Sequence, residues 1–256
     1  MSATRAILAG RLDPASALAL DEGLARAGAH RLSLALWRTE PAVVIGRFQR
    51  ADWEVDAGAC AGRDVRVWRR FTGGGAVYLD PGTVCAALCV PAAHPLSGLG
   101  VPQMYAPLLE AIVGALAACG VTATRDERTV RVDGHKVTGI AAHRGRGGHL
   151  VHGTLLVDAD LEALRACLAG TRGGELGGLP RPAASRPDTV ANTGAERFEE
   201  RLCEALDAEP GPLEPGEQSL VEQLRRDRYL TRAWHAGPWQ EATAADVVEV
   251  LGGAAM

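Results

Sequence analysis

Three consecutive glycines, Gly73 to Gly75, closely follow a pair of arginines in the segment Arg69-Arg70-Phe71-Thr72-Gly73-Gly74-Gly75. Consecutive glycines are costly in a folded chain because each loses much backbone entropy, so they suit a place where the backbone must approach a ligand. Bare backbone N–H groups and arginine side chains are both donors for phosphate or carboxylate. The segment therefore indicates an anion-binding loop. A glycine-rich hairpin with solvated arginines is the alternative for a GGG segment taken alone.

This loop differs from the standard nucleotide-binding loops. The chain has no Gly-Lys-Ser/Thr of a P-loop, and no G-x-G-x-x-G lies between a predicted strand and a predicted helix.

Lys136 is the only lysine in the chain, and every other member of its 27 Lys and Arg residues is an arginine. A lysine ammonium is a compact donor on a flexible stem, whereas a guanidinium is a broad planar fork, so the two are chemically distinct. A lysine retained in so arginine-rich a chain indicates a specific task. The alternative is a surface lysine left by chance.

The elements that must position these groups follow from periodicity and breakers. Strands and helices are interspersed without strict βαβ alternation, which predicts one α+β domain with a mixed, largely antiparallel central sheet flanked by helices. Pro/Gly-rich loops are expected at 91–102 and 173–187, and an extended tail with Trp234 and Trp239. We expect strands at 32–37, 42–45, 65–71, 76–79, 84–90, 129–132, 136–142 and 150–157, and helices at 15–27, 104–119, 160–170, 195–206 (capped by Asn192 or Thr193) and 217–228.

Composition excludes several classes of protein. The 27 Lys and Arg against 31 Asp and Glu give a net charge of −4, which argues against nucleic acid as the main partner. No apolar run reaches the ~18 residues of a membrane span and the N-terminus lacks the layout of a signal peptide, so we expect no membrane partner and a cytoplasmic protein. The six cysteines are scattered without a C-x-x-C, and the four histidines between 135 and 152 lack neighbouring ligands, so no protein-bound metal site is expected.

The segment 69–80, RRFTGGGAVYLD, resembles the signature of lipoate–protein ligases, within the larger group of biotin and lipoate ligases. Further segments are similar to that family's motifs in the same order. They are 43–49 (VVIGRFQ), 132–139 (VDGHKVTG), 151–158 (VHGTLLVD), Ser185 with 190–192, and 229–234, so that the resemblance extends over 8–237.

The resemblance implies the fold of the biotin/lipoate ligase catalytic domain and a two-step reaction. Lipoate or octanoate and ATP, accompanied by Mg²⁺, would form an acyl-adenylate and pyrophosphate, and a carrier lysine would then take the acyl group. Lys136 would be catalytic, bridging the lipoyl carbonyl oxygen and the α-phosphate. The binding residues implied with it are Arg70, Gly73, Gly74, Gly75, Ala76, Val77, Tyr78, Asp80, His152, Gly153 and Thr154.

The resemblance also implies the partners. The acceptor would be a lipoyl carrier domain, such as a 2-oxoacid dehydrogenase subunit or a glycine-cleavage carrier protein. We expect a catalytic domain over 1–240 and a tail over 241–256, too short for the accessory C-terminal domain of many relatives, so a separate accessory subunit is a possible partner. Carriers of this kind are typically acidic, so docking would need a local basic patch. Its candidates are Arg69, Arg125, Arg128, Arg131, Arg144 and Arg146.

Several positions depart from the family pattern and keep alternatives open. The usual His-Asp after the glycine loop is Leu79-Asp80, a polar segment beyond it becomes Gly82-Thr83-Val84-Cys85, and Arg128-Thr129 stands near the place of an Asn-Asp pair. One alternative is an ATP-independent octanoyl or lipoyl transferase that uses a cysteine, with Cys85 or Cys89 as its candidate. Another is a non-catalytic lipoyl-binding subunit of a two-protein ligase. A biotin ligase is the weakest alternative, because the Gly/Arg loop at 144–148 follows the lysine segment instead of preceding it.

Overall fold

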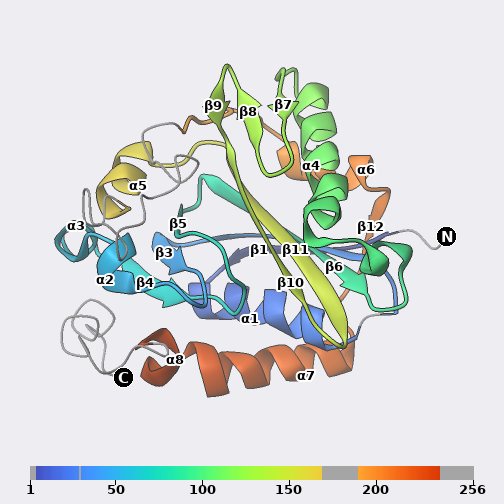
Figure 1. Cartoon of the computed structure of the whole chain (residues 1–256), viewed down its shortest axis with the longest axis horizontal. Helices are drawn as coiled ribbons and strands as arrows, with labels where there is room; N and C mark the ends of the chain where they lie inside the picture. The colour runs from blue at the N-terminus through green and yellow to red at the C-terminus, as the bar shows by residue number, and fades with distance from the viewer. Residues whose placement is uncertain (1–3, 29, 169–189, 237–256) are drawn as a thin grey trace.

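A mixed sheet of six strands forms the centre of the computed structural model, which describes residues 4–28, 30–168 and 190–236 (Figure 1). In sheet order the strands are β10 (Thr138–Arg144), β11 (Gly148–Leu156), β6 (Thr83–Pro91), β2 (Ser33–Thr39), β1 (Thr4–Leu12) and β12 (Ala208–Pro210). The pairs β10–β11, β11–β6 and β6–β2 are antiparallel, whereas β2–β1 and β1–β12 are parallel. The predicted mixed, largely antiparallel sheet is therefore confirmed.

Two small sheets accompany the central one, each with three strands. The first consists of β4 (Arg66–Arg69), β3 (Ala42–Ile45) and β5 (Val77–Leu79), and the glycine loop connects its strands β4 and β5. The second consists of β7 (Thr124–Arg125), β8 (Val130–Val132) and β9 (His135–Lys136), and it carries the single lysine.

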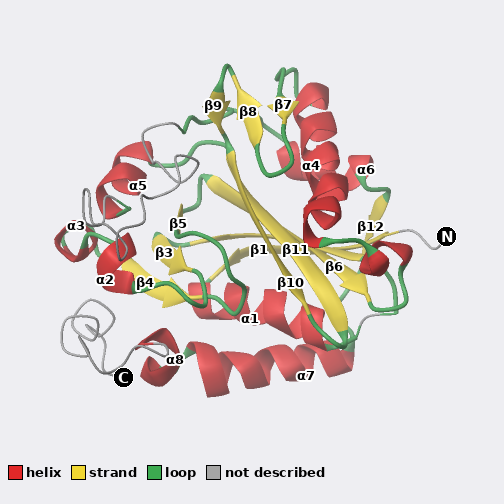
Figure 2. Cartoon of the chain, viewed as in Figure 1, coloured by secondary structure: helices red, strands yellow, loops and turns green. Residues whose placement is uncertain are grey.

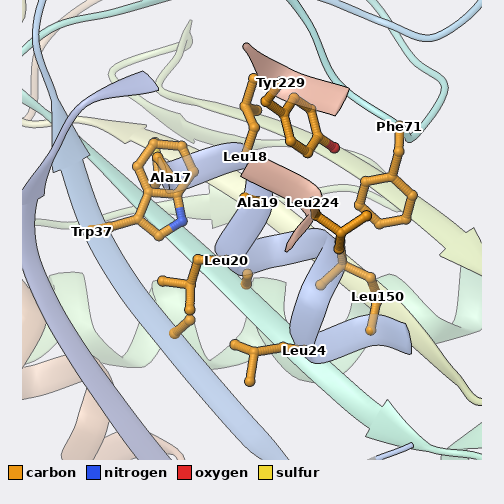
Figure 3. Close-up of a cluster of buried hydrophobic side chains, with 14 of the residues drawn as sticks. Ala17, Leu18, Ala19, Leu20, Leu24, Trp37, Phe71, Leu150, Leu224 and Tyr229 are labelled. Atoms are coloured by element: carbon orange, nitrogen blue, oxygen red, sulfur yellow. The ribbon is translucent and has the colours of Figure 1, made fainter. Parts of the chain in front are cut away.

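Alternate residues of the central strands enter two separate hydrophobic layers, as the period of a strand requires. On one face, Trp37 of β2 packs in a cluster with Leu18, Leu20 and Leu24 of helix α1 (Pro14–Arg26) and Leu224 of helix α7 (Pro215–Leu224) (Figure 3). On the other face, β2 packs through Leu34 and Leu36 against helices α4 (Val101–Ala118) and α6 (Phe198–Ala205). The helices thus flank the sheet on both sides (Figure 2).

Helix α4 is the one helix in the described part of the chain whose length and composition would allow it to cross a membrane. The sequence predicted a helix over 104–119, and in the structure this helix begins three residues earlier, at Val101. Its inner face, which includes Leu108, Leu109 and Ile112, is fully buried in the second hydrophobic layer. The apolar composition of α4 is therefore accounted for by the core of the domain.

Short helices complete the chain. Two of them, α2 (Ala51–Glu54) and α3 (Ala57–Ala61), lie between β3 and β4, and α5 (Leu161–Cys167) packs on α3 and β5. The others are the 3₁₀ turn η1 (Pro95–Gly98), the π-helical turn η4 (Arg225–Tyr229) and α8 (Arg232–Ala236). η4 is anchored to α1 because the buried Glu22 accepts hydrogen bonds from Arg228 and from the Tyr229 hydroxyl.

Some local predictions were wrong. Trp234 lies in α8 and not in an extended tail, and α6 begins at Phe198 after Arg197, with neither Asn192 nor Thr193 as its cap. The Asn192 amide instead bonds both backbone groups of Ala159, which ties the chain after residue 190 to the start of α5. The expected loop at 173–187, Ser185, Trp239 and the tail at 241–256 lie outside the described residues.

Candidate active site

A single cavity of about 780 Å³ collects most of the residues that the sequence singled out. Its walls come from the glycine loop, the hairpin that carries Lys136, and strands β10 and β11. The predicted residues that line it are Arg70, Gly73, Gly74, Gly75, Ala76, Val77, Tyr78, Lys136, His152, Gly153 and Thr154. Predicted residues that are up to 84 positions apart in the sequence therefore line one cavity.

Arg70 stabilises the conformation of the glycine loop through hydrogen bonds to backbone carbonyls. Its side chain is 5% exposed, and it donates hydrogen bonds to the carbonyl oxygens of Val44, Gly73 and Gly75 at 3.1, 2.6 and 2.8 Å. Burial lowers the pKa of this guanidinium to about 10, so it stays charged at neutral pH. The prediction that Arg70 contacts a bound phosphate stays a prediction, and the structure adds a role in building the loop.

The inward-facing carbonyls fix where the loop presents its donors. A trans peptide directs its N–H opposite to its C=O, so the N–H groups of Gly74 and Ala76 point away from the Arg70 guanidinium. Gly74 also needs its lack of a side chain, because its φ is +93°. Gly46 packs against the outside of the loop so closely that a Cβ there would overlap the carbonyl oxygen of Gly74. The loop is thus held on both sides.

Arg69, the neighbouring arginine, has a structural task that rules out its predicted place in a docking patch. It is 2% exposed and donates to the carbonyl oxygens of Gly46, Arg47 and Gln49 at 3.2, 3.0 and 2.7 Å. It also binds α8, since its Nε donates to the carbonyl of His235 and its backbone N–H donates to the ring of the same residue. The correction has a simple cause: this arginine is used for internal carbonyl groups and does not reach solvent.

A buried relay of hydrogen bonds runs from Arg70 to a carboxylate under the cavity. Arg70 Nε donates to Thr72 Oγ1 at 3.0 Å, Thr72 Oγ1 lies 2.8 Å from His152 Nε2, and His152 Nδ1 lies 3.0 Å from Asp21 Oδ2. Trp37 Nε1 donates to the other Asp21 oxygen at 2.8 Å. All bonds are satisfied when the Thr72 hydroxyl donates to Nε2 and a neutral His152 donates from Nδ1. His152 lines the cavity, and its place in the wall of an active site stays a prediction.

Lys136 lies in the cavity wall with its charge partly removed from water. Burial lowers the pKa of its ammonium, the charge of the adjacent Arg131 lowers it further, and Asp126 opposes the shift. Its backbone is also fixed, because β9 pairs with β8 and the Lys136 carbonyl accepts the N–H of Ala191 at 3.3 Å. A cation in this setting gains stability from a bound anion.

Asp80 is the one predicted binding residue that does not line the cavity. One carboxylate oxygen accepts the N–H of Gly82 and the hydroxyl of Thr83, and the other accepts the N–H of Asp160 at 2.7 Å. Asp80 therefore fastens the β5–β6 turn to the start of α5, and its prediction as a ligand contact was wrong. Leu79 beside it is buried in the core.

Of the two candidate cysteines, only Cys85 lines the cavity. Burial raises the pKa of both Cys85 and Cys89 well above the ordinary value, and the Asp21 carboxylate raises both further. Both thiols therefore stay protonated at neutral pH, which agrees with the expectation of inert buried cysteines in a strand.

Only some arginines of the predicted basic patch are exposed in the structure. Arg131 lines the cavity beside Lys136, and Arg125 pairs with Glu110 on the surface. The exposed members of the predicted patch are Arg125, Arg128, Arg144 and Arg146.

Sequence reasoning missed the residues that support the site, above all Asp21, Trp37 and Thr72. The signal that could have found Asp21 is its position: it follows the apolar run Ala15–Leu20 within a helix, where an acidic side chain is buried and needs a partner. Nothing local indicates that its partner is His152, which is 131 residues away.

The chain was also compared with known proteins. Residues 13–206 match the family model of the lipoyl protein ligase A/B catalytic domain. The octanoyltransferase LipM of Kyrpidia tusciae is 34% identical over 229 residues, which cover 76% of this chain and 83% of that protein. A probable lipoate-protein ligase A of Mycoplasma pneumoniae is 33% identical over 129 residues, 50% of this chain but only 37% of that longer protein.

Solved structures share the fold over nearly the whole chain. A lipoate-protein ligase A bound with ATP superimposes with a TM-score of 0.77 at 26% identity, covering 92% of this chain and 99% of that one. A bi-partite lipoate protein ligase from Thermoplasma acidophilum, described together with its E2 lipoyl domain, gives a TM-score of 0.76 at 26% identity, covering 93% and 97%. The fold type that the motifs implied is confirmed.

The relay predicts the effect of removing one hydroxyl. Thr72→Val keeps the side-chain shape but removes the partner of His152 Nε2 and one of the two acceptors of Arg70 Nε, so we expect the free energy of unfolding in urea to fall by about 1–3 kcal/mol. Thr231→Val is the matched control, since it removes a single Thr231–Arg228 bond at the partly buried start of α8. Equal losses in the two variants would contradict a special role for Thr72.

Proposed function

The chain belongs to the lipoyl protein ligase A/B catalytic domain family, and from this premise we propose that it is an ATP-dependent lipoate–protein ligase. It activates lipoate or octanoate as the acyl-adenylate, releasing pyrophosphate, and transfers the acyl group to a lysine of a lipoyl carrier domain. One observation carries the proposal. A lysine ammonium and the glycine loop line the same cavity, and burial keeps the thiol of Cys85, its one cysteine among the described residues, protonated.

The cavity has the size and the two kinds of lining that these substrates need. Its volume of about 780 Å³ lies within the ~300–1,000 Å³ of small-molecule sites. Leu18, Trp37 and Val44 provide apolar wall, which supports binding of an acyl chain or dithiolane ring there. Lys136 and the glycine loop provide the polar wall, which supports binding of a carboxylate and a nucleotide phosphate.

In the first step a carboxylate oxygen attacks the α-phosphorus, and the bond to the β-phosphate oxygen breaks. Two anions must approach each other and negative charge grows on the leaving group, so the protein contributes mainly positive donors in fixed positions. Lys136 offers a point charge between the carboxylate and the α-phosphate, while the Gly74 and Ala76 N–H groups, whose direction Arg70 fixes, face the nucleotide.

In the second step the amine of the carrier lysine attacks the acyl carbonyl carbon, and AMP leaves. Lys136 is not the nucleophile here. Its ammonium donates to the carbonyl oxygen, where charge develops, and to the departing phosphate. A partly buried ammonium serves both steps without moving, because the same two oxygens remain beside it.

We expect Mg²⁺ to arrive with ATP and to be held mainly by phosphate oxygens and water. In residues 4–28, 30–168 and 190–236, no three histidine, cysteine or acidic side chains come together to bind a metal ion. We therefore expect the nucleotide, and not a cluster of these side chains, to hold Mg²⁺. No step of the mechanism is assigned to the metal ion.

A second candidate is an ATP-independent octanoyltransferase, which the 34% identity with the curated LipM protein favours. Such a reaction needs a thiolate nucleophile, and the only cavity cysteine among the described residues is Cys85. The raised pKa of its thiol opposes that role.

Free lipoate should make this protein exchange pyrophosphate with ATP. Exchange of radiolabelled pyrophosphate into ATP, dependent on lipoate, is expected for the wild type. Cys85→Ala should retain at least about half of that rate, since a protonated thiol takes no part in adenylation. A transferase or a non-catalytic lipoyl-binding subunit would show no exchange, and that outcome would reject the ligase.

Replacement of Lys136 should remove activity without unfolding the protein. We expect Lys136→Ala to lower carrier lipoylation by at least about 10²–10³-fold, the usual cost of a lost charge-stabilising donor. Lys136→Arg should fail as well, because a planar fork cannot replace a point donor between two oxygens. Lipoylation is measured by mass spectrometry of the carrier, with circular dichroism as the folding control; near-normal turnover in either variant would exclude Lys136 from the mechanism.

The carrier should dock through exposed arginines near the cavity. Lipoylation of a purified carrier domain by this chain is compared with and without a separate accessory subunit, as in the bi-partite ligase of Thermoplasma acidophilum. The association rate should fall as salt shortens the screening length from ~10 Å at 0.1 M to ~3 Å at 1 M. Salt-independent rates would reject Arg128, which lines the cavity, as a docking residue, and full activity of the chain alone would reject the accessory subunit.

A further inference from the structure

The hairpin that carries Lys136 has its register fixed by a two-residue turn. Asp133 and Gly134 both have positive φ, 49° and 78°, as a type I′ turn requires. The turn pairs Val132 with His135 and, one step further, Arg131 with Lys136. Arg131 and Lys136 are therefore direct cross-strand neighbours and project from the same face of the hairpin.

Burial shows which face that is. Val130 in β8 and Val137, directly after β9, are fully buried in the hydrophobic layer under α4. Since strand side chains alternate, Arg131 and Lys136 point the other way, and both line the cavity.

Two cations on directly opposed positions repel each other. Their Cβ atoms lie about 4.5–5.5 Å apart in such a pair, and like charges there are destabilising. Burial lowers the pKa of Lys136, and the charge of Arg131 lowers it further. Within the described part of the chain, Arg131 makes no ion pair, and its one hydrogen bond is to the Gly134 carbonyl at 3.3 Å.

Other charged groups also face this part of the cavity, namely Asp126, Glu127 and Arg128. Asp126 is already engaged, because one of its oxygens accepts the N–H groups of Arg128 and Thr129 at 2.8 and 2.9 Å. Arg128 is exposed, whereas Arg131 and Lys136 are both half-buried.

We propose that Arg131 and Lys136 form a two-cation subsite for the phosphates of a nucleoside triphosphate, in which Arg131 binds the pyrophosphate leaving group. This inference rests on the proposed ligase function. When the carboxylate oxygen bonds to the α-phosphorus, the bond from that phosphorus to the bridging oxygen breaks and its electron pair stays on pyrophosphate. The planar fork of Arg131, directly across the hairpin from Lys136, donates to that charge.

The variants Arg131→Gln, Arg131→Lys and Arg125→Gln test this subsite. Arg125 is the matched control, since it belongs to the same small sheet but pairs with Glu110 and does not line the cavity. In lipoate-dependent exchange, Arg131→Gln should raise the KM for ATP and the inhibition constant of pyrophosphate about 10- to 100-fold, the worth of a charge-assisted bond. Arg131→Lys should recover part of this loss, and Arg125→Gln should match the wild type in this exchange, which involves no carrier.

The second half-reaction separates binding of the leaving group from general damage. Purified lipoyl-adenylate contains no pyrophosphate, so Arg131→Gln should transfer its acyl group to the carrier at close to the wild-type rate. An equal loss in both half-reactions, or unchanged constants for ATP and pyrophosphate, would overturn the proposal.

A binding measurement keeps this outcome distinct from that of the ligase proposal. If the wild type shows no exchange, the ligase function fails, and calorimetry with inorganic pyrophosphate still tests the subsite. Binding by the wild type and by Arg125→Gln, weakened about tenfold or more in Arg131→Gln, supports an anion subsite in the cavity. Equal binding by all three proteins, or none by the wild type, rejects it.

Discussion

The burial of the Arg70 guanidinium is the constraint on which the site depends. A charge taken out of water needs hydrogen-bond acceptors, and here backbone carbonyls supply them, so that the glycine loop curls around the side chain. The relay through Thr72 and His152 then connects this cation to the buried Asp21 carboxylate. These hydrogen bonds together determine the direction of the loop's N–H groups, the ring orientation of His152 and the position of α1 beneath the sheet.

Two adjacent arginines at the end of β4 form hydrogen bonds with different segments of the domain. Side chains of consecutive strand residues point in opposite directions, so Arg70 reaches the glycine loop while Arg69 reaches the 46–49 loop and α8. The Trp234 indole adds a bond to the Arg69 carbonyl at 2.7 Å. The C-terminal helices, which are anchored to α1 through Glu22, are therefore coupled to the wall of the cavity although they contribute no residue to it.

The sequence allowed prediction of those features that depend on neighbouring residues. The apolar run Val84–Val90 predicted a buried strand, and the glycine triplet beside Arg70 predicted a ligand loop, because each signal lies within one segment. Hydrogen bonds between residues far apart in the sequence could not be predicted. Asp80 and Arg69 looked like ligand groups from their place in a motif, but each satisfies backbone groups far away in the sequence. Arg131 was assigned to the surface because the register set by Asp133 and Gly134 is visible only once the hairpin is formed.

The lysine content of the chain has a consequence for the proposed ligase reaction, which would form a reactive acyl-adenylate. An acyl-adenylate that escapes from the cavity acylates accessible amines without selection. Guanidinium groups stay protonated in proteins and are not acylated in this way, so the arginines can attract an acidic partner without competing for its acyl group. The single side-chain amine of this protein lies in the cavity wall at Lys136. In the proposed reaction the surface would offer no lysine for self-modification, and the amine of an incoming carrier would meet little competition.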